Sequence, residues 1–245
     1  VYLPPGVRPG ERPARPLPTV FELYEDFFDD TFSPTIAVLN AAGYVVVRPS
    51  VGFETGYPGE AWVKGVTAAA NHLVERGLAD SARLGVHGTS YGGYATNLLV
   101  TQTHRFKAAI NVSGKVDLIS FYTDSPRLGT RNVHAAERSQ DRIGATLWQA
   151  PMKYVAHSAI FQADRIRTPL LLITGAQDHN VPAENTREMY YALRRLGKEV
   201  VWVNYMNGGH GTPQTTAEDF ADYHRRVVGW YDEKLKRAEP GRTAQ

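Results

Sequence analysis

The feature that most constrains the fold is a regular alternation of short apolar runs with longer segments whose apolar residues follow helical spacing. Runs rich in β-branched and other aliphatic residues indicate buried strands. They lie at 18–24, 44–48, 82–87, 108–112, 169–174 and 200–205. Helical spacing predicts helices at 34–42, 60–75, 91–103, 182–196 and 215–236. This order predicts right-handed crossovers and one mostly parallel sheet covered by helices on both faces.

The length of 245 residues and a hydrophobic content of 42% suit a single α/β domain. We expect that domain to occupy 18–237, after the end of a strand and a loop at 1–17 and before a polar tail at 238–245. Between 121 and 167 the pattern loosens into short helical pieces, which predicts a cover over a site or an oligomer contact. The abrupt start at Val1 leads us to expect a fragment or a processed product.

The charge balance and the absence of cysteine exclude several classes of function. Lys and Arg number 27 and Asp and Glu 25, which gives no electrostatic case for nucleic acid or a membrane as partner. Without cysteine the chain has no disulfide, no thiolate metal site and no cysteine nucleophile, and it fits any compartment. No His-x-x-x-His or Glu-x-x-His pair suggests a metal, so we expect neither a metal nor a cofactor.

One short motif has the context that a nucleophilic serine needs. Gly88-Thr89-Ser90-Tyr91-Gly92 fits Gly-x-Ser-x-Gly and lies between a predicted strand and a predicted helix. The turn is so tight that a Cβ at Gly88 or Gly92 would collide with its neighbours. Such a turn predicts a strained Ser90 with a projecting hydroxyl at a helix N-terminus, which favours a developing negative charge. The alternative is a serine that only caps the helix.

A general base and an orienting acid follow later in the chain, each directly after a predicted strand. Asp178 follows the strand at 169–174, and His210 follows the strand at 200–205. The order Ser, Asp, His is the order of the α/β-hydrolase fold, and carboxyl ends of parallel strands share one edge of a sheet. The alternatives are a helix N-cap at Asp178, a plain loop histidine at His210, and His179 as the base.

Several further phrases make the chain resemble the prolyl oligopeptidase family of serine peptidases, in particular its acylaminoacyl-peptidase and dipeptidyl-peptidase branch. The Gly-x-Ser-x-Gly turn, or nucleophile elbow, extends here to Gly88-Thr89-Ser90-Tyr91-Gly92-Gly93-Tyr94. In addition, Asp178 precedes Val181-Pro182, and His210 precedes Gly211. The segments 147–158, 166–171 and 191–200 are similar to that branch as well. The resemblance covers about 17–236 and implies an α/β-hydrolase fold with Ser90, Asp178 and His210 as the catalytic triad.

The resemblance also implies residues that bind the substrate. The oxyanion would be held by the N–H of Tyr91 and by the hydroxyl of Tyr24, although the glycine-rich turn usual after this tyrosine is replaced by Glu25-Asp26-Phe27. A buried core tyrosine is the alternative at Tyr24. An apolar P1 pocket would be lined by Tyr91, Val116, Phe121 and Tyr122, with core packing as the alternative for the last three. Members of the family usually carry an N-terminal β-propeller, which would be a partner domain outside this chain.

These residues together predict a serine hydrolase that cleaves peptide or aminoacyl bonds through an acyl-enzyme. Two other functions remain open from the sequence. The first is a carboxylesterase for small acyl esters, because the same triad serves esters and amides. The second is a non-catalytic binding domain that retains the fold.

Overall fold

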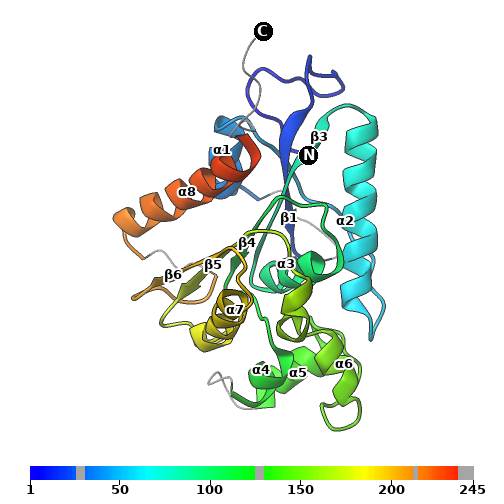
Figure 1. Ribbon diagram of the computed structural model, residues 1–245, viewed down its shortest axis with the longest axis vertical. Coiled ribbons are helices and arrows are strands. Elements are labelled where there is room, and N and C mark those ends of the chain that lie inside the picture. The colour runs from blue at the N-terminus through cyan, green and yellow to red at the C-terminus, as the bar shows by residue number, and fades with distance from the viewer. Residues whose placement is uncertain (26–30, 125–129, 212–214, 237–245) are drawn as a thin grey trace.

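A computed structural model gives the structure of the protein and describes residues 1–25, 31–124, 130–211 and 215–236. Its centre is a sheet of six strands in the order β2-β1-β3-β4-β5-β6. Every pair of neighbouring strands is parallel. Helices lie on both sides of the sheet (Figure 1). The predicted architecture of a mostly parallel sheet between helical layers is therefore confirmed.

The strands match the apolar runs of the sequence closely. They are β1 (Leu17–Leu23), β2 (Val45–Val47), β3 (Ala79–Thr89), β4 (Ala108–Val112), β5 (Leu170–Gly175) and β6 (Val200–Tyr205). The largest difference is in β3, which starts three residues before the predicted strand because Ala79 pairs with Leu17 at the beginning of β1. Tyr2 extends the sheet beyond its edge strand β2 through an antiparallel bridge to Val46.

The helices divide between two faces of the sheet. The first face is covered by α1 (Pro34–Ala41) and α8 (Ala217–Tyr231), and the second by α2 (Pro58–Glu75), α3 (Tyr91–Gln102) and α7 (Ala183–Arg195). Because successive strand residues point to opposite faces, Val20 packs with the first layer and Phe21 with the second. The last helix ends at Tyr231 and continues as a π-helical turn, Asp232–Lys236, so its α-helical part is shorter than predicted.

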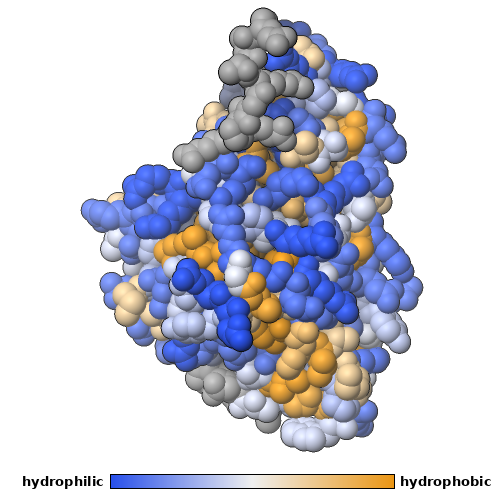
Figure 2. Space-filling view, viewed as in Figure 1, coloured by the Kyte–Doolittle hydropathy of each residue, from blue (hydrophilic) through white to orange (hydrophobic). Residues whose placement is uncertain are grey.

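The loosely patterned region after β4 forms short helices, as its sequence indicates. They are α4 (Leu118–Asp124), α5 (Thr130–Arg138), α6 (Pro151–Ala156) and the 3-10 segment η1 (Ala159–Arg165). An apolar area covers the part of the surface where α5 and α6 lie (Figure 2). Trp148 and Met152 are 76% and 71% exposed. This region therefore presents apolar side chains to solvent.

Among the described residues, no helix combines the length and the apolar character that crossing a bilayer requires.

Candidate active site

The predicted nucleophile Ser90 occupies a strained turn between β3 and α3. Its backbone has φ 57° and ψ −115°, a conformation that costs a non-glycine residue about 1–3 kcal/mol. The two flanking glycines permit the turn. A Cβ at Gly88 would lie 1.9 Å from the carbonyl oxygen of Gly92, and one at Gly92 would lie 1.9 Å from the carbonyl oxygen of Leu23. The sequence predicted this steric requirement, and the backbone geometry shows it.

Ser90 stands at the end of a line of two hydrogen bonds that joins three distant parts of the chain. Its Oγ lies 2.8 Å from Nε2 of His210, and Nδ1 of His210 lies 2.8 Å from Oδ2 of Asp178. Because a carboxylate accepts hydrogen bonds and does not donate them, Nδ1 carries the proton. In the neutral imidazole Nε2 is then the acceptor, so the Ser90 hydroxyl donates to it.

Asp178 is held by both of its carboxylate oxygens. Oδ1 accepts hydrogen bonds from the backbone N–H groups of Asn180 and Val181 at 2.8 and 2.9 Å, while Oδ2 faces His210. The side chain is completely buried. It closes a turn rather than capping α7, whose N-cap residue is Pro182. His179, the alternative base, is exposed.

The loop that carries His210 comes close to the end of β5. A Cβ at Gly175 would lie 2.2 Å from the carbonyl oxygen of Gly208, so only glycine permits this approach. The N–H of Gln177 donates to the same carbonyl at 2.8 Å. Gly211 follows with φ 68°, in the left-handed region that glycine adopts readily. Gly175 and Gly211 therefore each have a steric reason to be glycine, the first at the close approach of the His210 loop and the second in its left-handed backbone.

Tyr24 lies immediately after β1, beside the nucleophile turn. Its side chain is 47% exposed, so the alternative of a buried core tyrosine is wrong. The residue leaves the core because β1 ends at Leu23, one residue earlier than predicted. The indole of Trp62 donates to the carbonyl oxygen of Tyr24 at 3.2 Å, and the rings of Tyr24 and Tyr91 meet edge to face at 6.3 Å. The Tyr24 side chain is therefore a solvent-accessible group next to the elbow.

The four residues predicted to line a P1 pocket are all buried. Tyr91 and Val116 are 1% and 0% exposed, and Phe121 and Tyr122 are 4% and 8% exposed. The rings of Tyr91 and Phe121 both border Nζ of Lys115, at 6.0 and 4.5 Å from the ring centroids. Tyr122 instead contacts Tyr154 and Trp148. The structure thus brings Tyr91 and Phe121 around one cation, whereas Tyr122 faces a different aromatic group.

Three polar residues near the site were not singled out from the sequence. Lys115 and Asp141 form a buried ion pair, with Nζ 2.6 Å from Oδ2. Burial raises the pKa of Asp141, and the Lys115 cation opposes that rise. Asn185 on α7 accepts a hydrogen bond from the N–H of Val116 at 2.8 Å and donates to the carbonyl oxygen of Asp117. No local pattern signals these contacts, because their partners are 26 and about 69 residues apart.

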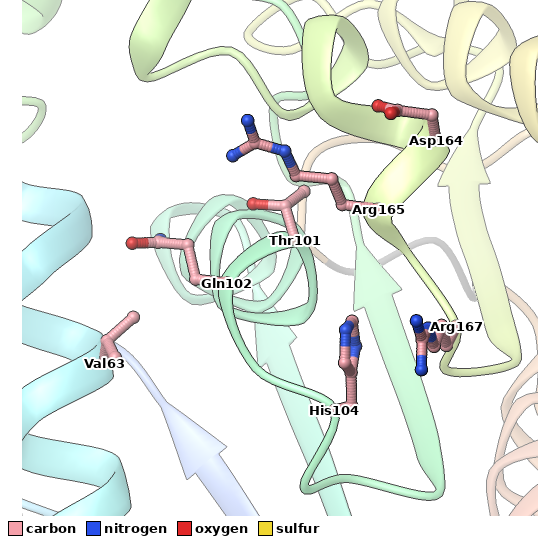
Figure 3. Close-up of a pocket in the computed structure, with 7 residues that line it drawn as sticks. All are labelled: Val63, Thr101, Gln102, His104, Asp164, Arg165 and Arg167. Atoms are coloured by element: carbon pink, nitrogen blue, oxygen red, sulfur yellow. The ribbon is translucent and has the colours of Figure 1, made fainter.

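A surface depression of about 590 Å³ is lined by residues other than those of this site (Figure 3). Thr101 and Gln102 line it at the C-terminus of α3, the helix that begins beside Ser90. His104 and Arg167 also line it, and they precede β4 and β5. In proteins with a parallel sheet, ligands bind beyond the carboxyl ends of the strands. This depression lies instead at the amino ends of β4 and β5. We therefore assign the candidate site to the surroundings of Ser90.

Comparisons with known proteins show the family of the chain. The prolyl oligopeptidase family matches residues 30–238. The uncharacterized peptidase YuxL of Bacillus subtilis is 31% identical over 223 residues, which cover 85% of this chain and 33% of that protein. The acylamino-acid-releasing enzyme of Arabidopsis thaliana is 27% identical over 84% of this chain and 28% of its own length. The chain thus spans about a third of the length of these relatives.

Solved structures show the same fold. An acylaminoacyl peptidase in complex with Z-Gly-Gly-Phe-chloromethyl ketone is 25% identical, with a TM-score of 0.77 over 97% of this chain and 40% of that one. A puromycin-hydrolyzing peptidase of Mycobacterium tuberculosis is also 25% identical, with a TM-score of 0.77 over 94% of this chain and 36% of that one. With its α/β-hydrolase fold and a family match over most of its length, the chain belongs to the prolyl oligopeptidase family of serine peptidases.

Proposed function

We propose that this chain hydrolyses peptide or aminoacyl bonds with Ser90 as nucleophile, His210 as general base and Asp178 as the acid that orients it. The observation that carries the proposal is the unbroken line of hydrogen bonds from Ser90 Oγ through His210 to Asp178, with both distances at 2.8 Å. A serine hydroxyl is a weak nucleophile at neutral pH and requires an adjacent base. The line supplies that base and fixes the tautomer that it needs.

The reaction proceeds in two steps. Ser90 Oγ bonds to the carbonyl carbon of the substrate while its proton passes to Nε2 of His210, and buried Asp178 stabilises the imidazolium. The bond from carbon to the leaving amine then breaks, and the amine takes the proton from Nε2. Water attacks the acyl-enzyme in the second step and gives its proton to His210. The acid product leaves, and the proton returns to Ser90.

Two groups hold the oxyanion in this proposal. The N–H of Tyr91 belongs to the first turn of α3, where backbone N–H groups have no helical partner and the helix dipole favours negative charge. The Tyr24 hydroxyl is the second donor, supported by the position of its backbone. A Cβ at Gly92 would lie only 3.5 Å from the Cα of Tyr24.

The substrate class is a peptide or an acylated amino acid with an apolar P1 side chain. The aromatic rings of Tyr91 and Phe121, which lie around one point, support this preference. The similar acylaminoacyl peptidase is known in complex with Z-Gly-Gly-Phe-chloromethyl ketone, a peptide derivative whose last amino-acid residue is phenylalanine. The name of the Arabidopsis relative points to N-acylated amino acids as substrates. N-acetyl-phenylalanine is therefore the first acyl group to test, with phenylalanine at P1.

A fluorophosphonate probe and two chromogenic substrates test the proposal. The protein should be labelled by the probe and should cleave N-acetyl-Phe-p-nitroanilide. Ser90→Ala should lose labelling and turnover, whereas Ser81→Ala, an exposed serine on the same strand, should keep both. Cleavage of p-nitrophenyl acetate without any cleavage of the anilide would instead indicate a carboxylesterase. Absence of labelling would indicate a binding domain that retains the fold.

A further inference from the structure

A compact hydrogen-bonded cluster joins the loop that carries Tyr24 to residues 140–142, more than a hundred positions later in the chain. Nε2 of Gln140 lies 2.5 Å from Oε1 of Glu25 and 3.3 Å from the hydroxyl oxygen of Tyr24. The Arg142 guanidinium lies 3.5 Å from the other carboxylate oxygen of Glu25. It also donates to the hydroxyl oxygen of Tyr91 at 3.1 Å. Residues 140–142 thus contact both tyrosines of the proposed oxyanion site.

The direction of the bond between Gln140 and Tyr24 follows from its neighbour. The Glu25 carboxylate can only accept, so the Gln140 amide must turn its nitrogen toward Glu25. The same nitrogen reaches Tyr24, whose hydroxyl oxygen is therefore the acceptor. This hydrogen bond leaves the hydroxyl proton of Tyr24 to be donated to another group. Accepting a hydrogen bond also polarises the O–H group and strengthens it as a donor.

Residues 140–142 are themselves fixed from several sides. Asp141 is anchored by its buried ion pair with Lys115, and the N–H of Gly56 donates to the carbonyl oxygen of Arg142 at 2.5 Å. Arg142 has φ 51°, which an arginine adopts only where surrounding contacts impose it. Its guanidinium also stacks over the ring of Phe53 at 4.7 Å. The cluster therefore rests on a rigid support rather than on a solvated loop.

We propose that Gln140 and Arg142 are positioning residues that hold the Tyr24 hydroxyl toward the oxyanion, Gln140 directly and Arg142 through Glu25. The inference rests on the proposed function and adds to it. Tyr24 is half exposed and lies outside the sheet, so β1 alone does not fix the direction of its side chain. The Gln140 amide supplies that direction, and the charge of Arg142 holds Glu25, which in turn holds the amide in its orientation.

A double-mutant cycle on kcat for N-acetyl-Phe-p-nitroanilide tests the inference. Tyr24→Phe should lower kcat by about 10²–10³, the loss typical of one oxyanion donor. Gln140→Leu should lower kcat by about fivefold, the value of one hydrogen bond, with KM little changed. When Tyr24→Phe is already present, Gln140→Leu should have no further effect. The control is Gln162→Leu, since the Gln162 amide donates to the carbonyl oxygen of Ala156, and this variant should leave kcat unchanged in both backgrounds.

The outcomes separate this inference from the proposed function. If Gln140→Leu lowers kcat by the same factor with and without Tyr24→Phe, Gln140 acts on the structure in general and the inference is wrong. If Gln140→Leu has no effect in either background, it is equally wrong. In both cases labelling and turnover of the unmodified protein still support Ser90 as the nucleophile. Absence of labelling and turnover in the unmodified protein would overturn both proposals.

Discussion

The histidine on the strand that leads to the nucleophile gives a stability prediction whose size follows from its burial. His87 on β3 is 2% exposed, and its Nδ1 has no hydrogen-bond partner among the described residues. Burial lowers its pKa from the usual 6.5 to about 4, against the attraction of Glu22 on β1 and with some help from His224 on α8. The folded protein therefore keeps this imidazole neutral at a pH where the unfolded chain protonates it.

The sign and size of the effect follow from proton linkage. Between pH 6.5 and pH 4 the unfolded state binds the additional proton, so stability is full above pH 6.5 and is lost as the pH falls toward 4. The difference between the two pKa values corresponds to about 3 kcal/mol in total, of which about 2 kcal/mol is lost between pH 7 and pH 5. His157, whose pKa burial also lowers, adds a loss of the same sign.

Urea unfolding at pH 7 and pH 5, followed by tryptophan fluorescence, measures this loss. His87→Gln should reduce the difference in unfolding free energy between the two pH values by about 2 kcal/mol relative to the unmodified protein. Ile110→Val is the matched control, because Ile110 pairs with His87 across the sheet and does not titrate. It should lower stability and keep the full pH difference. The reasoning fails if His87→Gln leaves the pH difference intact.

Three further predictions concern the elbow, the proposed acid and the buried ion pair. Gly92→Ala should lower the melting temperature by roughly 5 °C or more, because the added Cβ would lie 1.9 Å from the carbonyl oxygen of Leu23. Thermal unfolding measures this loss, and Gly229→Ala is the control, because an added Cβ at Gly229 has nothing within 4 Å. Asp178→Asn should lower kcat by about 10⁴ with little change in melting temperature, since the amide stabilises the wrong tautomer of His210; equal loss in His179→Asn would contradict this. Lys115→Met should lower the free energy of unfolding in urea by about 3–5 kcal/mol, because it leaves the buried carboxylate of Asp141 without its cation. The double variant Lys115→Met with Asp141→Leu should recover most of this loss.

The parts of the structure that the sequence predicted depend on local rules. The strands follow from apolar runs, and the close approaches at Gly88 and Gly92 follow from the steric demands of a strand that turns directly into a helix. The meeting of Ser90, Asp178 and His210 follows from one topological rule, because each residue comes directly after a strand of the same parallel sheet. The relation between these residues thus did not require knowledge of side-chain packing.

The parts that the sequence did not predict depend on contacts between irregular segments. The end of β1 at Leu23 decides whether Tyr24 is buried or exposed, and a shift of one residue at a strand end is below what residue patterns resolve. The bonds of Glu25 to Gln140 and Arg142 join residues about 115 positions apart. Lys115 and Asp141 both lie outside strands and helices, so no periodicity links them.

This division has a consequence for how the proposed site is held together. The residues of the proposed triad follow strands β3, β5 and β6, whose parallel pairing fixes the relative positions of the strand ends. Tyr24 follows β1, which pairs with β3 as far as Leu23 opposite Gly88, so its backbone is set by the same sheet. Its hydroxyl, however, lies a full side chain away from that support, and the described contact to this hydroxyl oxygen comes from Gln140. The sheet therefore places the backbone that precedes Ser90, Asp178 and His210, whereas the hydroxyl of Tyr24, the proposed second oxyanion donor, is contacted from the segment 140–142 through Gln140.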